Sequence, residues 1–68
     1  MTTGAVGQQI RERRRSLRLT QAALASLAGC SERFVRGLES GRSGIRLDKL
    51  EAVLDVLGLE LRIEPRLP

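Results

Sequence analysis

Apolar side chains recur at the spacing of helix turns through most of the chain. Near the N-terminus, Val6, Ile10 and Leu17 are separated mainly by Arg and Gln, which predicts a helix over about Val6–Ser16 with one buried stripe. The period is clearest in a later segment, which we predict to be a helix over Leu47–Leu57. The apolar positions of that helix are Leu47, Leu50, Val53, Leu54 and Leu57.

Two shorter helices are predicted between these segments. Thr20 is a good N-cap, and the helix that follows it ends at Gly29, which adopts a left-handed conformation without strain. Ser31 is a second N-cap, and from it a helix runs to about Ser40, burying Val35. The expected inner face of the first short helix is Leu24, Ala25, Leu27 and Ala28.

After the last helix the period changes from 3.6 to 2. In LELRIE, Leu59, Leu61 and Ile63 alternate with charged residues, which predicts a half-buried strand over residues 59–64, ended by Pro65. Because no other segment resembles a strand, its backbone groups need a partner, and the same strand of a second subunit in a two-fold dimer supplies one. The alternatives are an extended tail packed on the last helix, or a frayed terminus.

The length of 68 residues predicts one domain over residues 1–68, all-α apart from the terminal strand. A core of this size rarely supplies more than ~3–5 kcal/mol, so dimerisation is the expected support. With a single Cys30 and no His, we expect no internal disulfide, no metal and no cofactor. No apolar run approaches the ~18 residues that cross a bilayer, so we expect a soluble, cytoplasmic protein.

Charge divides the chain into two unequal parts. Residues 1–46 hold nine Arg and three acids, a balance of +6, whereas residues 47–68 hold three bases and five acids, a balance of −2. Eleven of the twelve bases are Arg, whose planar fork suits phosphates and guanine edges, so a polyanion is the expected partner of the first part. The alternative is that the arginines only solvate helix faces. No nucleophile with a base and no phosphate loop is present, so we predict no enzyme.

Two short helices joined by a tight Gly-containing turn are typical of a helix-turn-helix, whose second helix enters the DNA major groove. We expect Ala25 to be small because the two helices cross closely there. Cys30, Val35 and Leu38 then hold the second helix to the core. By elimination, its outer face is Glu32, Arg33, Arg36 and Gly37.

The segment LTQAALASLAGCSERFVRGLESGR resembles the Xre/Cro group of helix-turn-helix proteins, which includes the lambda-type repressors, and the resemblance covers about Val6–Leu57. It implies a lambda-repressor-like four-helix domain. Within that group, RLDKLEAVLDVLGLELRIE is similar to HipB-type antitoxins, whose helical domain ends in a strand that pairs across the dimer. The residues that match the group are Leu19, Thr20, Gln21, Leu24, Ala25, Gly29, Cys30, Val35, Leu38, Glu39 and Gly41.

The resemblance implies two kinds of DNA contact. Gln21 matches a position that binds a DNA phosphate, and the residues Ser31, Glu32 and Arg33 match the leading end of the recognition helix. Arg33 suits guanine O6 and N7, while Glu32 either accepts from cytosine N4 or orients a neighbouring Arg. Arg36 reaches a base or a phosphate. The loop that tracks the DNA backbone in the group corresponds here to Arg42 and Arg46.

The resemblance also implies an ion pair between Arg14 and Glu39, which fixes the angle of the recognition helix; the alternative is two solvated surface charges. Two residues depart from the group's pattern. Gly37 gives up a base-reading side chain, and Phe34, the only aromatic residue, replaces a small polar one. Phe34 touches a thymine methyl group or packs beside Leu38 in the core, and the second is favoured.

These features predict a homodimeric, sequence-specific DNA-binding repressor of a palindromic operator, associated with the nucleoid. The HipB likeness implies the antitoxin of a toxin–antitoxin pair that represses its own operon, with a HipA-like kinase toxin as a candidate partner. The alternatives are a free-standing regulator, such as a phage repressor or a restriction-modification controller, and a protein-interaction module that has lost DNA binding.

Overall fold

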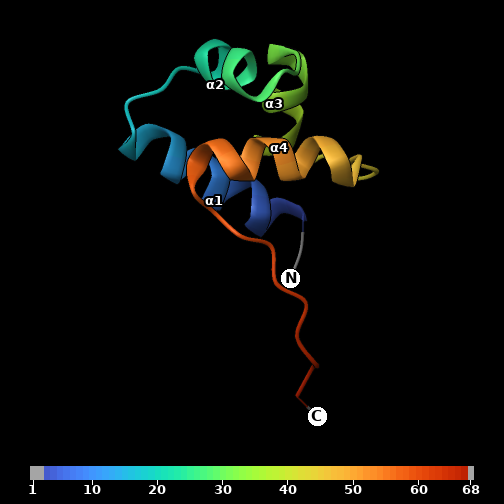
Figure 1. The fold of residues 1–68 in the computed structure, drawn as a ribbon. Helices are drawn as coiled ribbons and strands as arrows, with labels where there is room; N and C mark the ends of the chain where they lie inside the picture. The colour runs from blue at the N-terminus through green and yellow to red at the C-terminus, as the bar shows by residue number, and fades with distance from the viewer. Residues whose placement is uncertain (1–2, 68) are drawn as a thin grey trace.

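The structure is a computed structural model that describes residues 3–67, and these fold into four helices. They are α1 (Thr3–Ser16), α2 (Gln21–Ala28), α3 (Glu32–Glu39) and α4 (Leu47–Leu57). The short helices α2 and α3 lie side by side on one side of the molecule, while α1 and α4 cross on the other (Figure 1). The predicted all-helical body of four helices is confirmed, although α1 begins three residues before the predicted start at Val6.

All four helices contribute to one small core. Burying each large side chain contributes about 1.5–3 kcal/mol, so one to three buried residues from each helix hold the bundle together. Partly buried residues, among them Val6, Leu19 and Leu50, pack around the core. The buried apolar residues are Ile10, Leu24, Ala25, Val35, Leu38, Val53, Leu54 and Leu57.

Three leucines that the sequence pattern assigned to buried faces are exposed. Leu17 lies beyond the last residue of α1 and is 41% exposed. Leu27 is 64% exposed because the buried face of α2 centres between Leu24 and Ala25, about 100° around the helix from it. Leu47 opens α4 and is 56% exposed. The apolar pattern therefore fails to predict burial at helix ends, as for Leu17 and Leu47. It also fails on the two-turn helix α2, whose contact face is too narrow to include Leu27.

All four helices end in the same hydrogen-bonded turn, in which a left-handed residue lets the chain leave the helix. In α1, for example, the N–H of Leu19 donates to the carbonyl of Arg14 at 3.1 Å. Three of the left-handed residues are glycines, which adopt this conformation readily, and the fourth is an arginine. In chain order they are Arg18 (φ 58°), Gly29 (φ 70°), Gly41 (φ 83°) and Gly58 (φ 68°).

The segment after α4 leaves the helical body and runs outward (Figure 1). Residues 59–67 contain no strand in the described chain. Leu59 packs against the core, but Ile63 and Leu67 are 96% and 87% exposed. A single chain offers this segment no neighbouring strand with which to form a ladder. The expected strand over residues 59–64 is therefore not seen, and its pairing across a dimer stays a prediction.

Candidate nucleic-acid interface

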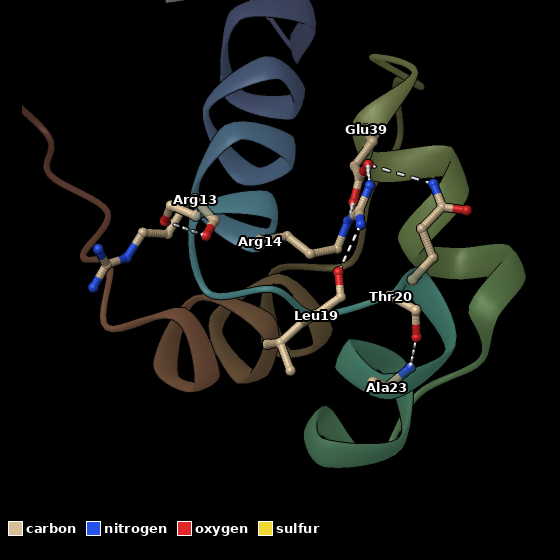
Figure 2. Close-up of polar contacts among 8 residues, drawn as sticks. Arg13, Arg14, Leu19, Thr20, Ala23 and Glu39 are labelled. Carbon is tan, nitrogen blue, oxygen red and sulfur yellow. Dashed lines mark hydrogen bonds and ion pairs between the residues drawn. The ribbon is translucent and has the colours of Figure 1, made fainter.

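A side-chain cap fixes where each of the helices α2 and α3 begins. The hydroxyl oxygen of Thr20 accepts a hydrogen bond from the N–H of Ala23 at 3.0 Å (Figure 2). At the start of α3, the hydroxyl oxygen of Ser31 accepts from the N–H of Phe34, also at 3.0 Å. Between the caps, Gly29 supplies the left-handed turn. The small turn therefore sets α3 at a defined angle to α2.

A buried ion pair joins α1 to the end of α3. Nε and Nη2 of Arg14 donate to the two carboxylate oxygens of Glu39 at 2.7 and 2.9 Å, and Nη1 donates to the carbonyl of Leu19 at 2.8 Å (Figure 2). The two side chains are only 10% and 4% exposed. The hydrogen bond and the charge of Glu39 raise the pKa of Arg14 against the opposing effect of burial. The charged pair locks α3 to both α1 and the α1–α2 connection.

Gln21, the first residue of α2, is the third donor to the buried carboxylate. Its Nε2 donates to Oε1 of Glu39 at 3.4 Å, and its side chain is half-buried. One N–H of the amide is thus directed into the protein. The second N–H of the same group remains for a contact to a DNA phosphate, which stays a prediction for Gln21.

The outer face of α3 is open to solvent. Ser31, Glu32, Arg33 and Arg36 are all exposed. Glu32 and Arg36 form a loose ion pair at 3.4 Å, with side chains 48% and 62% exposed, and such surface pairs are easily exchanged for another anion. Within residues 3–67, Arg33 lies within ion-pair distance of no carboxylate. Its fork is therefore available to a partner.

The side chain of Arg42 crosses α3 at Gly37. A Cβ added at Gly37 would lie 3.3 Å from Cδ of Arg42, so the glycine makes room for the arginine stem. Gly37 is thus half-covered and not part of the open outer face that elimination predicted. Gly37 and Arg42 both border a hollow of about 530 Å³, here called the loop hollow, with no acidic residue in its lining. Its lining residues are Arg33, Arg36, Gly37, Ser40, Gly41 and Arg42.

This arrangement of two capped, two-turn helices, of which the second carries exposed arginines, agrees with the sequence comparison. A family model described as a helix-turn-helix domain matches residues 5–64. The chain belongs to this helix-turn-helix family. No curated protein matches it significantly. In helix-turn-helix domains the second helix, called the recognition helix, enters the major groove of DNA, and α3 holds that position in this chain.

At the far end of the α3–α4 loop of the helix-turn-helix domain, Arg46 already has a partner. Its Nη2 and Nε donate to the two carboxylate oxygens of Asp48 at 2.7 and 3.2 Å, and both side chains are well exposed. These hydrogen bonds, foremost among the causes, lower the pKa of Asp48. A DNA phosphate must compete with this carboxylate, so Arg46 is a weaker candidate for a backbone contact than Arg42.

Cys30 lies in the turn before α3 of the helix-turn-helix domain, and Phe34 lies on α3 itself. Both are partly buried and pack against the core, and Nζ of Lys49 lies 5.7 Å from the centroid of the Phe34 ring. This position agrees with the core role favoured for Phe34. Burial raises the pKa of the Cys30 thiol, partly offset by the charge of Lys49, so the thiol is an apolar filler at neutral pH.

Two residues that hold the helix-turn-helix domain together were not predicted from the sequence. Gly7 is buried where α1 crosses the end of α3, and a Cβ there would run into the carbonyl oxygens of Leu38 and Glu39. Nε of Arg13 donates to the carbonyl of Leu57 at 2.8 Å and so caps α4 from another helix. For Gly7, the sequence signal was a glycine inside an otherwise helical pattern. For Arg13, the sequence contains no signal of this contact.

Within the described part of the chain, no helix is both long and apolar enough to cross a membrane. Among the same residues, no group of three potential ligands is placed to hold a metal ion.

Proposed function

We propose that the protein is a dimeric repressor that recognises a two-fold DNA operator. The observation that carries the proposal is the loop hollow, where three exposed arginines surround a space on the recognition helix whose lining contains no acid. Such an arrangement suits phosphates and guanine edges. In a helix-turn-helix protein the same surface meets the major groove.

The proposed contacts follow from the exposed donors. Arg33 forks onto guanine O6 and N7, and Glu32 either accepts from cytosine or orients Arg36 across their loose ion pair. Ser31 donates its hydroxyl proton to a base, since its oxygen already caps α3. The duplex backbone is held by Gln21, Arg42 and, against competition from Asp48, Arg46. The ion pair of Arg14 with Glu39 contributes the fixed angle of α3 and makes no base contact itself.

Dimerisation through the tail is supported by its own pattern of charges and apolar residues. Two copies of this segment placed antiparallel, with Leu61 on the two-fold axis, bring Glu60 opposite the second subunit's Arg62 and Leu59 opposite the second subunit's Ile63. Moving the axis by one residue to Arg62 sets Glu60 against the second subunit's Glu64. The first register buries the exposed Ile63 and satisfies both charge pairs.

The biological setting we propose is the cytoplasm, on the nucleoid, as the antitoxin of a pair that represses its own operon. The similarity of residues 46–64 to HipB-type antitoxins supports this, and a HipA-like kinase is the corresponding toxin. A free-standing phage-type or restriction-modification regulator is the alternative within DNA binding. Co-purification with the product of the adjacent gene separates the two.

The direct test is binding to DNA over a range of salt concentrations. Duplexes are selected from a random-sequence pool with the wild-type protein, and the affinity for the selected duplex is measured by titration. We expect a two-fold symmetric site with half-sites about 34 Å apart, and a logarithm of affinity that falls linearly with the logarithm of salt. If no duplex is enriched and binding shows no salt dependence, the proposal is wrong. A protein-interaction module would give that result.

A further inference from the structure

A second hollow lies on the other side of Arg36, and α1 forms one of its walls. It has a volume of about 380 Å³ and is here called the α1 hollow. Arg36 and Ser40 line both hollows, so Arg36 stands between them. The ion pair of Arg14 with Glu39 also borders the space. The remaining lining residues are Arg11, Arg15 and Gln21.

The α1 hollow is cationic although it contains a carboxylate. Glu39 is only 4% exposed, and its oxygens already accept from Arg14 and Gln21, so it cannot serve a further arginine well. Since Arg14 cancels its charge, a surplus of three positive charges remains on Arg11, Arg15 and Arg36. The loose pair with Glu32 leaves Arg36 free to exchange.

Arg11 and Arg15 lie one turn apart on α1, where two like charges repel each other. Both are exposed, and in residues 3–67 neither lies within ion-pair distance of a carboxylate. The acid between them, Glu12, instead accepts a hydrogen bond from Gln8 at 3.3 Å. Two exposed guanidinium groups without a carboxylate partner, beside a hollow, are the arrangement that a bound anion stabilises.

We propose that α1 is part of the DNA interface, and that Arg11 and Arg15 bind phosphates of the strand that lies along the α1 hollow. This inference rests on the proposed function, because it extends the same surface. A helix in the major groove has a sugar–phosphate backbone along each side. The loop hollow, through Arg42, faces one backbone, and the α1 hollow faces the other. Arg36, between the hollows, points along the groove.

The test compares variants of α1 on two duplexes, the one selected by the wild-type protein and a random-sequence duplex of equal length. Arg11→Ala and Arg15→Ala are measured singly and together. The slope of log affinity against log salt should become shallower by about 0.9 for each phosphate that the protein no longer neutralises. Affinity should fall by the same factor on both duplexes, because phosphates carry no sequence information. Melting temperature should stay unchanged, because both side chains are exposed.

Two controls separate phosphate binding from a general decrease in charge. The double variant Arg11→Lys with Arg15→Lys keeps the positive charges and should retain most of the slope. Arg66→Ala removes one charge from the tail, far along the chain, and should leave the slope at the wild-type value. The inference is overturned if the slope of log affinity against log salt is the same for the Arg11→Ala, Arg15→Ala double variant as for Arg66→Ala. In that case, DNA binding by the wild-type protein still supports the proposed function.

Two further outcomes are decisive. A loss of affinity confined to the selected duplex would mean that α1 reads bases, and it overturns the assignment to phosphates. A wild-type protein that binds neither duplex overturns the proposed function and the inference with it.

Discussion

The inward and outward sides of α1 use the same residue type in different ways. Arg13, Arg14 and Arg15 are consecutive, yet Arg14 is buried with all three nitrogens hydrogen-bonded inside the protein, whereas Arg15 is exposed and lies within ion-pair distance of no carboxylate in the described residues. Arg13 lies between these extremes, with Nε on the carbonyl of Leu57. An arginine whose donors are used internally holds the fold, and one whose donors are unused is available to DNA.

The largest expected effect comes from removing Glu39, the partner of the buried Arg14. Glu39→Ala leaves Arg14 buried without its carboxylate, which typically costs about 3–5 kcal/mol and most of the stability of a domain this small. We expect the melting temperature to fall by more than about 10 °C and DNA affinity to fall with it. Urea unfolding followed by circular dichroism measures the change.

The matched control is Glu32→Ala, which breaks the exposed pair with Arg36 and should change stability by no more than about 0.5 kcal/mol. Equal stabilities of the two variants would mean that burial does not distinguish the arginines of this domain.

The inward side of α1 also depends on a close backbone approach at Gly7. Gly7→Ala places a Cβ against the carbonyls of Leu38 and Glu39, and we expect a loss of about 1–3 kcal/mol from the strain. Gly4→Ala, in the exposed first turn of the same helix, should instead stabilise by up to about 1 kcal/mol. Denaturant midpoints of the two proteins should move in opposite directions. A shift of the same sign would contradict the close approach of α1 to the end of α3.

On the exposed face of α3, Arg33→Ala is expected to lower DNA affinity without affecting folding. The melting temperature should stay within about 2 °C of wild type, because the side chain is exposed and unpaired among the described residues. Affinity for the selected duplex should fall by about 1–3 kcal/mol, with relaxed preference at one base pair. Titration against all four bases at each position measures both. An unaltered base preference would remove Arg33 from the base-reading set.

The sequence predicted the positions of the helices better than it predicted which arginines stabilise the fold and which are exposed. Capping residues such as Thr20 and Ser31, and glycine at position 29, act locally, so their positions in the chain determined the helix ends. Arg13 and Gly7 act on segments more than thirty residues further along, and no local pattern specifies such a contact. The pair of Arg14 with Glu39 was anticipated only through resemblance to a family.

The tail contains an exposed arginine, Arg62, whose donors would be used within the protein if the tails pair in a dimer. Arg62 lies 3.6 Å from Glu60 of its own chain, and both are about three-quarters exposed. In the proposed register with Leu61 on the two-fold axis, Glu60→Arg sets two arginines against each other at two symmetric places. We expect the dimer to weaken by roughly 0.5–2 kcal/mol, and the double variant Glu60→Arg with Arg62→Glu to restore it.

Sedimentation velocity over a concentration series measures the dimerisation constant of these variants. Glu64→Arg is the matched control, because in this register Glu64 lies opposite a glycine and its charge change should matter least. If the double variant dimerises no better than Glu60→Arg alone, the tails pair in another register or do not pair.

The smallest predicted effect concerns an arginine whose backbone matters more than its charge. Arg18 ends α1 in the left-handed conformation that glycine takes at the other three helix ends. A side chain there costs roughly 1–2 kcal/mol, of which glycine's greater freedom in the unfolded chain cancels a part. Arg18→Gly should therefore stabilise the domain by up to about 1 kcal/mol, whereas Arg18→Ala should not, although both remove the same charge. A gain of equal size in both variants would show that charge repulsion near the end of α1, and not backbone conformation, makes this position unfavourable.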